Sequence, residues 1–181
     1  MYPLQLRLIL RPDSVNKPHV LIIVQNLSVP YDRRVWLECN SLVDNGFDVS
    51  VICPRANGDS KRETLNGVKI YRYAPAPMTS GVLSFLVEFT YCFIRTFVLS
   101  LKIQFRKKID VVQTCNPPDT YWVLGLFFRI FGSTFVFDQH DLCPEIFDAR
   151  FGENPGLFKR LLRKGLVIFE KGNYRTACKV I

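Results

Sequence analysis

The segment from Asp138 to Gly152 holds the densest group of chemically capable side chains in the sequence. His140 and Asp141 stand near its start, and Glu145 and Arg150 follow. An imidazole among carboxylates can move protons and orient hydroxyl groups, and an arginine can balance phosphate charge. Helix capping and loop salt bridges would be a purely structural use of the same residues. Because the segment follows a short apolar strand, at the edge where open α/β sheets bind ligands, we favour a functional site.

A second polar segment follows the first apolar run of the chain. Its sequence Tyr31-Asp32-Arg33-Arg34 places an N-capping aspartate at the start of a helix. Two arginines at a helix N-terminus suit an anionic ligand such as a diphosphate, whereas the structural alternative is a solvated first turn. The candidate acceptor- or phosphate-binding residues of this segment are Asn26, Tyr31, Asp32, Arg33 and Arg34.

Alternating strands and helices must position these segments. Continuous apolar runs predict buried strands at His19 to Val24, Phe47 to Cys53, Asp110 to Cys115 and Thr134 to Phe137, and shorter ones are expected at 68–73 and from Cys178. Helical spacing predicts helices from Asp32 to Gly46, from Gly81 to Phe105, from Asp119, as cap, to Gly132, and from Pro155 to about Tyr174. Residues 55–67 are polar, with turns expected at Asn57-Gly58 and Asn66-Gly67, and residues 138–154 are expected to be polar and irregular.

This alternation predicts an α/β fold with a doubly wound, mostly parallel, Rossmann-like sheet. The carboxyl ends of parallel strands lie at one edge, so both polar segments should meet a third one there, which begins at Asn116. The sequence contains neither G-x-G-x-x-G nor a P-loop motif, which counts against a dinucleotide oxidoreductase and a P-loop NTPase. His19 begins a strand, and we expect a structural role for it.

The chain is basic, with a formal net charge of +8. Such a charge suits nucleic acid, an anionic membrane or a phosphorylated ligand, although a solvated surface is the simplest explanation. Much of the excess lies beside Phe-rich helices, which favours a membrane surface. We expect no nucleic-acid partner, because no recognition motif is present.

Two of the expected helices are candidates for membrane contact. In the long one, Glu88, Arg95 and Lys102 recur at a spacing of seven residues, which makes a spanning helix costly. We prefer a helix lying partly on the core and partly on the bilayer surface to one that is fully protein-buried. The basic amphipathic helix near the C-terminus is the other candidate, with a core-packed helix as its alternative. The candidate membrane-facing residues are Phe85, Phe89, Phe93, Phe97, Arg160, Arg163 and Lys164.

None of the six cysteines forms a C-x-x-C pair or has a histidine at metal-ligand spacing. Most lie in apolar runs and read as buried, reduced thiols of a cytoplasmic protein. The cysteine pattern therefore predicts no metal ion, and we also expect no cofactor.

Two stretches together resemble the family-4 glycosyltransferases, which have the GT-B architecture. The first is Val20 to Pro54, with HVLIIVQN, the helix entry at Asp32-Arg33-Arg34-Val35, and LVDNGFDVSVIC. The second is VFDQHDLCPEIFDARFG, Val136 to Gly152, where family members carry a His, an acidic residue and a Pro-Glu. The C-terminal helix leading into Ala177 to Ile181 also matches, so the resemblance covers roughly 19–181.

The resemblance implies a retaining enzyme that transfers a sugar from a nucleotide-sugar to a glycan or lipid-linked acceptor, usually without a metal. Such enzymes serve glycan and polysaccharide synthesis, often peripheral to the cytoplasmic face of the membrane. By position, His140 would contact the transferred sugar, Asp141 would support it, and Asp32, Arg33 and Arg34 would lie near the diphosphate. Many members have Gly-Gly after the first strand, but here Ser28-Val29-Pro30 stands there, so an arginine would replace the backbone phosphate cradle.

The resemblance also implies a domain organisation. We expect residues 1–18 to be an extension and 19–181 to be the acceptor-side domain, incomplete because the sequence ends at the start of a strand. The donor domain, with its paired glutamates, would be missing, and the chain alone would be inactive. The alternative is a non-catalytic, membrane-associated Rossmann-like module that pairs with a separate donor-domain chain.

Overall fold

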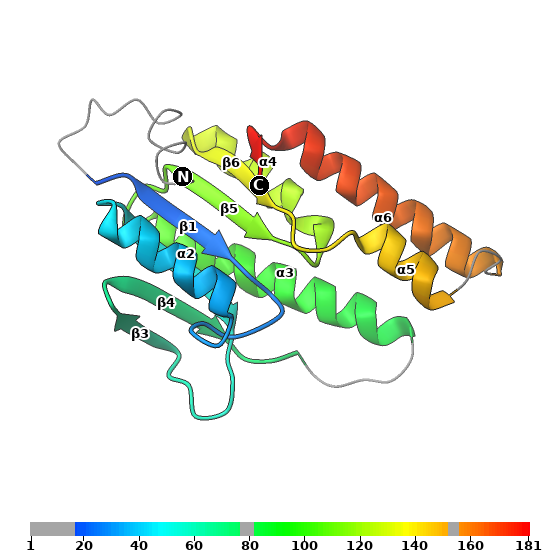
Figure 1. Ribbon diagram of the computed structural model, residues 1–181, viewed down its shortest axis with the longest axis horizontal. Coiled ribbons are helices and arrows are strands. Elements are labelled where there is room, and N and C mark those ends of the chain that lie inside the picture. The colour runs from blue at the N-terminus through cyan, green and yellow to red at the C-terminus, as the bar shows by residue number, and fades with distance from the viewer. Residues whose placement is uncertain (1–16, 77–81, 152–155) are drawn as a thin grey trace.

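A computed structural model describes residues 17–76, 82–151 and 156–181. These residues form a seven-stranded sheet flanked by helices (Figure 1). The strands are β1 (His19–Ile23), β2 (Asp48–Pro54), β3 (Arg62–Leu65), β4 (Val68–Tyr73), β5 (Val111–Cys115), β6 (Thr134–Asp138) and β7 (Lys179–Val180). The helices are α2 (Arg33–Asp44), α3 (Val82–Gln104), α4 (Trp122–Phe128), α5 (Cys143–Phe151) and α6 (Leu157–Thr176), with short 3₁₀ turns at Asp119–Tyr121 and Arg129–Phe131.

The strand order is β3-β4-β2-β1-β5-β6-β7. Every pair is parallel except β3 with β4, which form an antiparallel hairpin at one edge. From β1 the chain first builds the sheet outward through β2 and β4, and then returns to add β5, β6 and β7 on the other side of β1. The order therefore reverses between β1 and β5, and ligands in open α/β sheets bind beside such a switch point.

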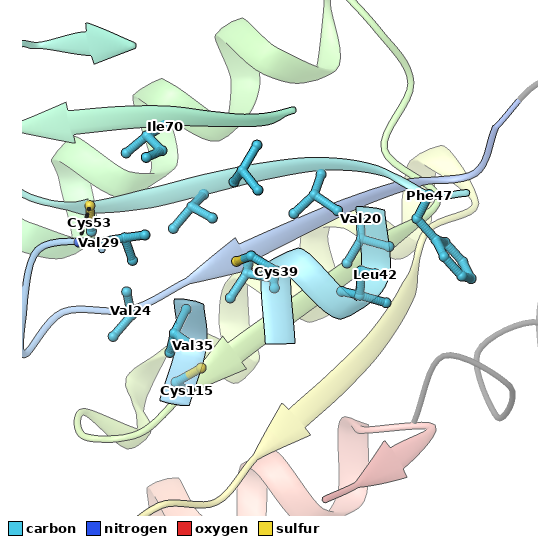
Figure 2. Close-up of a cluster of buried hydrophobic side chains, with 14 of the residues drawn as sticks. Val20, Val24, Val29, Val35, Cys39, Leu42, Phe47, Cys53, Ile70 and Cys115 are labelled. Atoms are coloured by element: carbon cyan, nitrogen blue, oxygen red, sulfur yellow. Dashed lines mark hydrogen bonds between the residues drawn. The ribbon is translucent and has the colours of Figure 1, made fainter. Parts of the chain in front are cut away.

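Helices cover both faces of the sheet, which confirms the predicted mostly parallel α/β architecture. On one face α2 contributes Val35, Cys39 and Leu42 to a buried cluster with the strands (Figure 2). On the other face α3 and α4 pack against the strands through side chains such as Ile103, Leu124 and Phe128. Figure 1 shows α2 and α3 on opposite sides of the sheet. Alternate strand residues thus point into two apolar layers, as burial on both faces requires.

Local sequence signals fix several boundaries as predicted. The side chain of Asp32 accepts a hydrogen bond from Val35 N at 3.1 Å and caps α2. Gly46 and Gly132 follow helical segments with φ of 83° and 78°, the left-handed conformation that glycine adopts without strain. His19 is buried, and its Nε2 lies 2.9 Å from Ser50 Oγ, which confirms its structural role.

The predicted turns at Asn57-Gly58 and Asn66-Gly67 are present, with φ of 84° and 81° at the two glycines. Between them, residues 62–65 form β3, a strand that was not predicted, because pairing with β4 supplies its hydrogen bonds. Two local predictions were wrong. The segment predicted to be irregular contains α5. Asp119 makes no capping hydrogen bond, since its segment begins as a 3₁₀ turn and its side chain is buried against Asn116.

The predicted membrane-facing aromatic residues of α3 need correction. Phe93 and Phe97 pack against the buried cluster beneath α3, where Phe93 stacks on Tyr121 and Phe97 meets Phe127 edge to face. They face the protein because they lie on the side of α3 that also carries the buried Cys92 and Ile103 and that packs on the sheet. Phe89 is half-buried on the same helix, and the side chain of Phe85 lies outside the described part of the structure.

Among the helices that the structure describes, none is both long enough and apolar enough to cross a bilayer. On α6, Arg160 and Lys164 are exposed, whereas Arg163 is half-buried and forms an ion pair with Asp148 of α5. That pair neutralises one of the three cationic side chains that were predicted to face a membrane.

Candidate functional site

The three polar segments converge at the switch point, as the fold class predicts. Asn116, which follows β5, uses its side-chain oxygen to accept hydrogen bonds from the backbone N–H groups of His140 (2.6 Å) and Asp141 (3.1 Å). Arg34, in the first turn of α2, reaches Asp138 at the end of β6. The segments after β1, β5 and β6 are therefore tied together by side chains that lie far apart in the sequence.

Asp138 is the centre of this arrangement. Its Oδ1 accepts from Arg34 at 2.5 Å, and its Oδ2 lies 2.6 Å from His140 Nε2. The carboxylate is 1% exposed, while the side chains of His140 and Arg34 are 16% and 56% exposed. A buried carboxylate that is compensated on one side by an arginine can hold an imidazole in one orientation on the other. We call these three residues the Arg–Asp–His array.

Asn116 shapes the backbone beside the array. Its Nδ2 donates to Asp141 O at 2.6 Å and to Asp119 Oδ1 at 3.0 Å, and the residue is 2% exposed. Both ends of this amide are thus used inside the protein, and the amide fixes the chain on either side of His140 rather than contacting solvent. Asn116 was predicted to bind a ligand, but in this geometry it positions the loop that carries His140.

Two residues that were not predicted to belong to the site lie behind the array. Glu38, one helical turn after Arg34, accepts from Gln113 Nε2 of β5 at 3.0 and 2.9 Å. Gln113 is fully buried in the middle of the sheet, where a polar residue is unusual. Burial raises the pKa of Glu38 to about 7, and the nearby charge of Asp138 adds to the rise, while Gln113, Arg34 and His140 oppose it. The glutamine inside the apolar strand VVQTC was the available signal.

A hydrogen-bonded chain lies on the other face of the same switch point. Gln25, which follows β1, accepts from the hydroxyl group of Tyr121 at 2.9 Å, and that hydroxyl lies 3.4 Å from Thr96 Oγ1 of α3. Gln25 is 8% exposed and the other two side chains are buried. These residues were not predicted to lie near the site, because only the packing of α3 brings Thr96 to the sheet edge.

A buried arginine forms hydrogen bonds to the loop between β1 and α2. Arg72 of β4 has no exposed side-chain surface, and its Nε donates to Ser28 Oγ at 3.0 Å. The same guanidinium also donates to the carbonyl oxygen of Val29 and pairs with Asp59 and Glu63. Side-chain hydrogen bonds therefore set the path of Ser28-Val29-Pro30, in place of the glycine pair that the resemblance led us to look for.

The remaining predicted site residues do not join the array. Asn26, Tyr31 and Arg33 are exposed in the segment that follows β1, and Asp32 is occupied as the α2 cap. Glu145 is exposed on α5, where its charge acts on Arg163 and Glu170 of α6. The side chain of Arg150 lies outside the described residues.

Three potential metal ligands lie close together here. Cys115 Sγ, the carboxylate of Asp138 and the ring of His140 offer atoms within 4.8 Å of one another. Both oxygens of Asp138 already accept hydrogen bonds, from Arg34 and from His140, and Cys115 Sγ donates to Asp138 Oδ2 at 3.5 Å. In this structure the three groups are therefore joined by hydrogen bonds.

Comparison of the sequence with models of known protein families, and with curated proteins, finds no match. Function is therefore inferred from the geometry of the Arg–Asp–His array and from the resemblance of the two segments that carry it.

Proposed function

We propose that this domain is the acceptor-side half of a GT-B glycosyltransferase, which transfers a sugar from a nucleotide-sugar to a lipid-linked or glycan acceptor with retention of configuration. The observation that carries the proposal is the Arg–Asp–His array at the switch point between β1 and β5. Leaving out β3, the strand order follows the doubly wound arrangement in which ligands bind at this position. The two segments that resemble family-4 glycosyltransferases supply Arg34 on one side and Asp138 with His140 on the other.

Each member of the array has a role in this proposal. Asp138 binds His140 Nε2, so that Nδ1 would face a sugar hydroxyl group. Arg34 donates one hydrogen bond to Asp138, and its side chain is 56% exposed. Its other N–H groups would therefore bind an acceptor phosphate near the N-terminus of α2. A separate donor-binding domain would deliver the nucleotide-sugar above His140. In this proposal the enzyme works at the cytoplasmic face of a membrane, where the acceptor is anchored.

Two neighbouring arginines provide the test. We would titrate the protein with a short-chain prenyl diphosphate-linked sugar and compare Arg34→Gln with Arg33→Gln by calorimetry. Loss of a charge-assisted hydrogen bond at Arg34 should weaken binding about tenfold or more, whereas Arg33, which is exposed and outside the array, should matter much less. Equal losses at both positions, or no binding by the unmodified protein, would refute the proposed acceptor site.

A further inference from the structure

The side of α3 that faces away from the sheet is apolar. Val87, Ile94 and Val98 lie on this side, and Phe105 continues the line just after the helix ends. Their spacing of seven, four and seven residues places them on one helical stripe, opposite the buried Cys92, Thr96, Ser100 and Ile103. An ordinary surface helix would carry polar residues here, so this stripe needs an explanation other than packing against its own sheet.

The neighbouring helix α4 presents the same kind of surface. Leu124 and Phe128 point into the core, and the exposed residues on the other side are Val123, Leu126 and, in the following 3₁₀ turn, Ile130. Phe97 of α3 meets Phe127 of α4 with ring centroids 5.0 Å apart, so the two helices lie side by side on one face of the sheet. Their outward sides therefore form one surface, which we call the α3–α4 outer face.

The seven apolar residues of the α3–α4 outer face are each between 38% and 79% exposed. Single exposed aliphatic residues are normal on soluble proteins, but a group this large on two adjacent helices indicates a contact surface. The face is distinct from the predicted aromatic set, because Phe93 and Phe97 point to the core.

The charges around the face favour one kind of occupant. The charged residues of these helices and the 3₁₀ turn are Glu88, Arg95, Lys102 and Arg129, and Arg106 follows α3. Arg95, Lys102 and Arg106 are exposed, and Glu88 is the one carboxylate in the set. A second copy of the chain would bring like charges together at such a face, whereas anionic lipid headgroups would complement them.

We propose that the α3–α4 outer face docks on the surface of an anionic bilayer, with its aliphatic side chains at the headgroup level and Arg95, Lys102 and Arg106 among the lipid phosphates. The geometry is that of a helix lying in the plane of the interface. The inference deepens the proposed function, on which it rests for the idea of a membrane-carried acceptor, by naming the surface that holds the domain on the membrane.

Flotation with vesicles tests the inference without any acceptor. The full chain should float with vesicles of phosphatidylglycerol and phosphatidylcholine at low salt, and less with phosphatidylcholine alone. The double variant Ile94→Glu, Val98→Glu should lower the partition coefficient roughly tenfold or more, because it replaces two apolar contacts with like charges at an anionic surface. The matched control is Leu37→Glu on α2, which is also exposed but lies on the opposite face of the sheet, and it should change little.

Other outcomes would overturn the inference. Retained flotation in the double variant, with loss on charge reversal at Arg160 and Lys164, would assign the membrane contact to α6. A dimer that dissociates in the double variant, detected by light scattering, would make the face a self-association surface. Thermal melting of both variants checks that they are folded, which we expect because the substituted residues are exposed. Acceptor binding in solution is measured separately, so failure of docking and failure of the proposed acceptor site are distinguishable.

Discussion

Glu38 should make this domain less stable as the pH rises from about 5 to about 8, and a substitution of Glu38 should remove this dependence. Its pKa rises from an ordinary 4.5 to about 7 on folding, mainly through burial. The unfolded chain therefore loses the Glu38 proton at a lower pH than the folded chain does. The stability that the protonated side chain contributes is fully present below about pH 4.5 and is lost as pH rises to about 7.

The substitution is Glu38→Gln, which mimics the protonated carboxyl group and can still accept from Gln113. Proton linkage with the two pKa values gives a loss of about 1 kcal/mol at about pH 5 and about 3 kcal/mol at about pH 8 for the unmodified chain. The variant has no such loss. Its stability relative to the unmodified chain should therefore rise by about 2 kcal/mol between these two pH values.

Urea unfolding at both pH values measures this difference, and the subtraction removes every titration that the two proteins share. Asp44→Asn is the matched control, because Asp44 is an exposed carboxylate at the end of the same helix. This prediction would be refuted if the stability difference between Glu38→Gln and the unmodified chain were the same at both pH values. That result would show that burial does not raise the pKa of Glu38 in the folded protein.

Two further predictions concern packing and accessibility. A Cβ atom at Gly172 of α6 would lie 2.8 Å from the Trp122 ring, so Gly172→Ala should cost about 1–3 kcal/mol in chemical denaturation, whereas Gly165→Ala, which has open space, should stabilise the same helix by about 0.5–1 kcal/mol. If both substitutions had the same effect, α6 would not lie on Trp122. Cys178 is the one exposed cysteine, so a thiol reagent should label it first in the native protein, with Cys143 slower and the other four protected until unfolding. Mass spectrometry after brief labelling identifies the site, and early modification of Cys115 would contradict the buried position of that strand end.

Much of the fold could be predicted because its signals are local. Apolar runs marked the four central parallel strands, and Asp32, Gly46 and Gly132 marked helix ends through their own backbone chemistry. The failures occurred where a partner decided the outcome. Strand β3 exists because β4 lies beside it, and Asp119 turns inward to Asn116 instead of capping a helix.

The candidate site divides in the same way. The sequence indicated which segments would meet, because strand carboxyl ends share an edge, and it identified Arg34 and His140. It could not indicate that Asp138 links them, or that Glu38 and Gln113 lie behind, because Arg34 and Asp138 are 104 residues apart and Glu38 and Gln113 are 75 apart. Such pairs follow from strand order and helix orientation.

The sequence by itself determined the class of fold, the edge of the sheet where chemistry is expected, and the apolar character of α3. Only the tertiary structure decided which side of α3 faces outward. Helical periodicity was weak there because α3 is apolar on nearly all sides, and the Phe residues were assigned outward when Phe93 and Phe97 pack on the core. The sheet buries one side and exposes the other, so the orientation of α3 follows from its neighbours rather than from its own sequence.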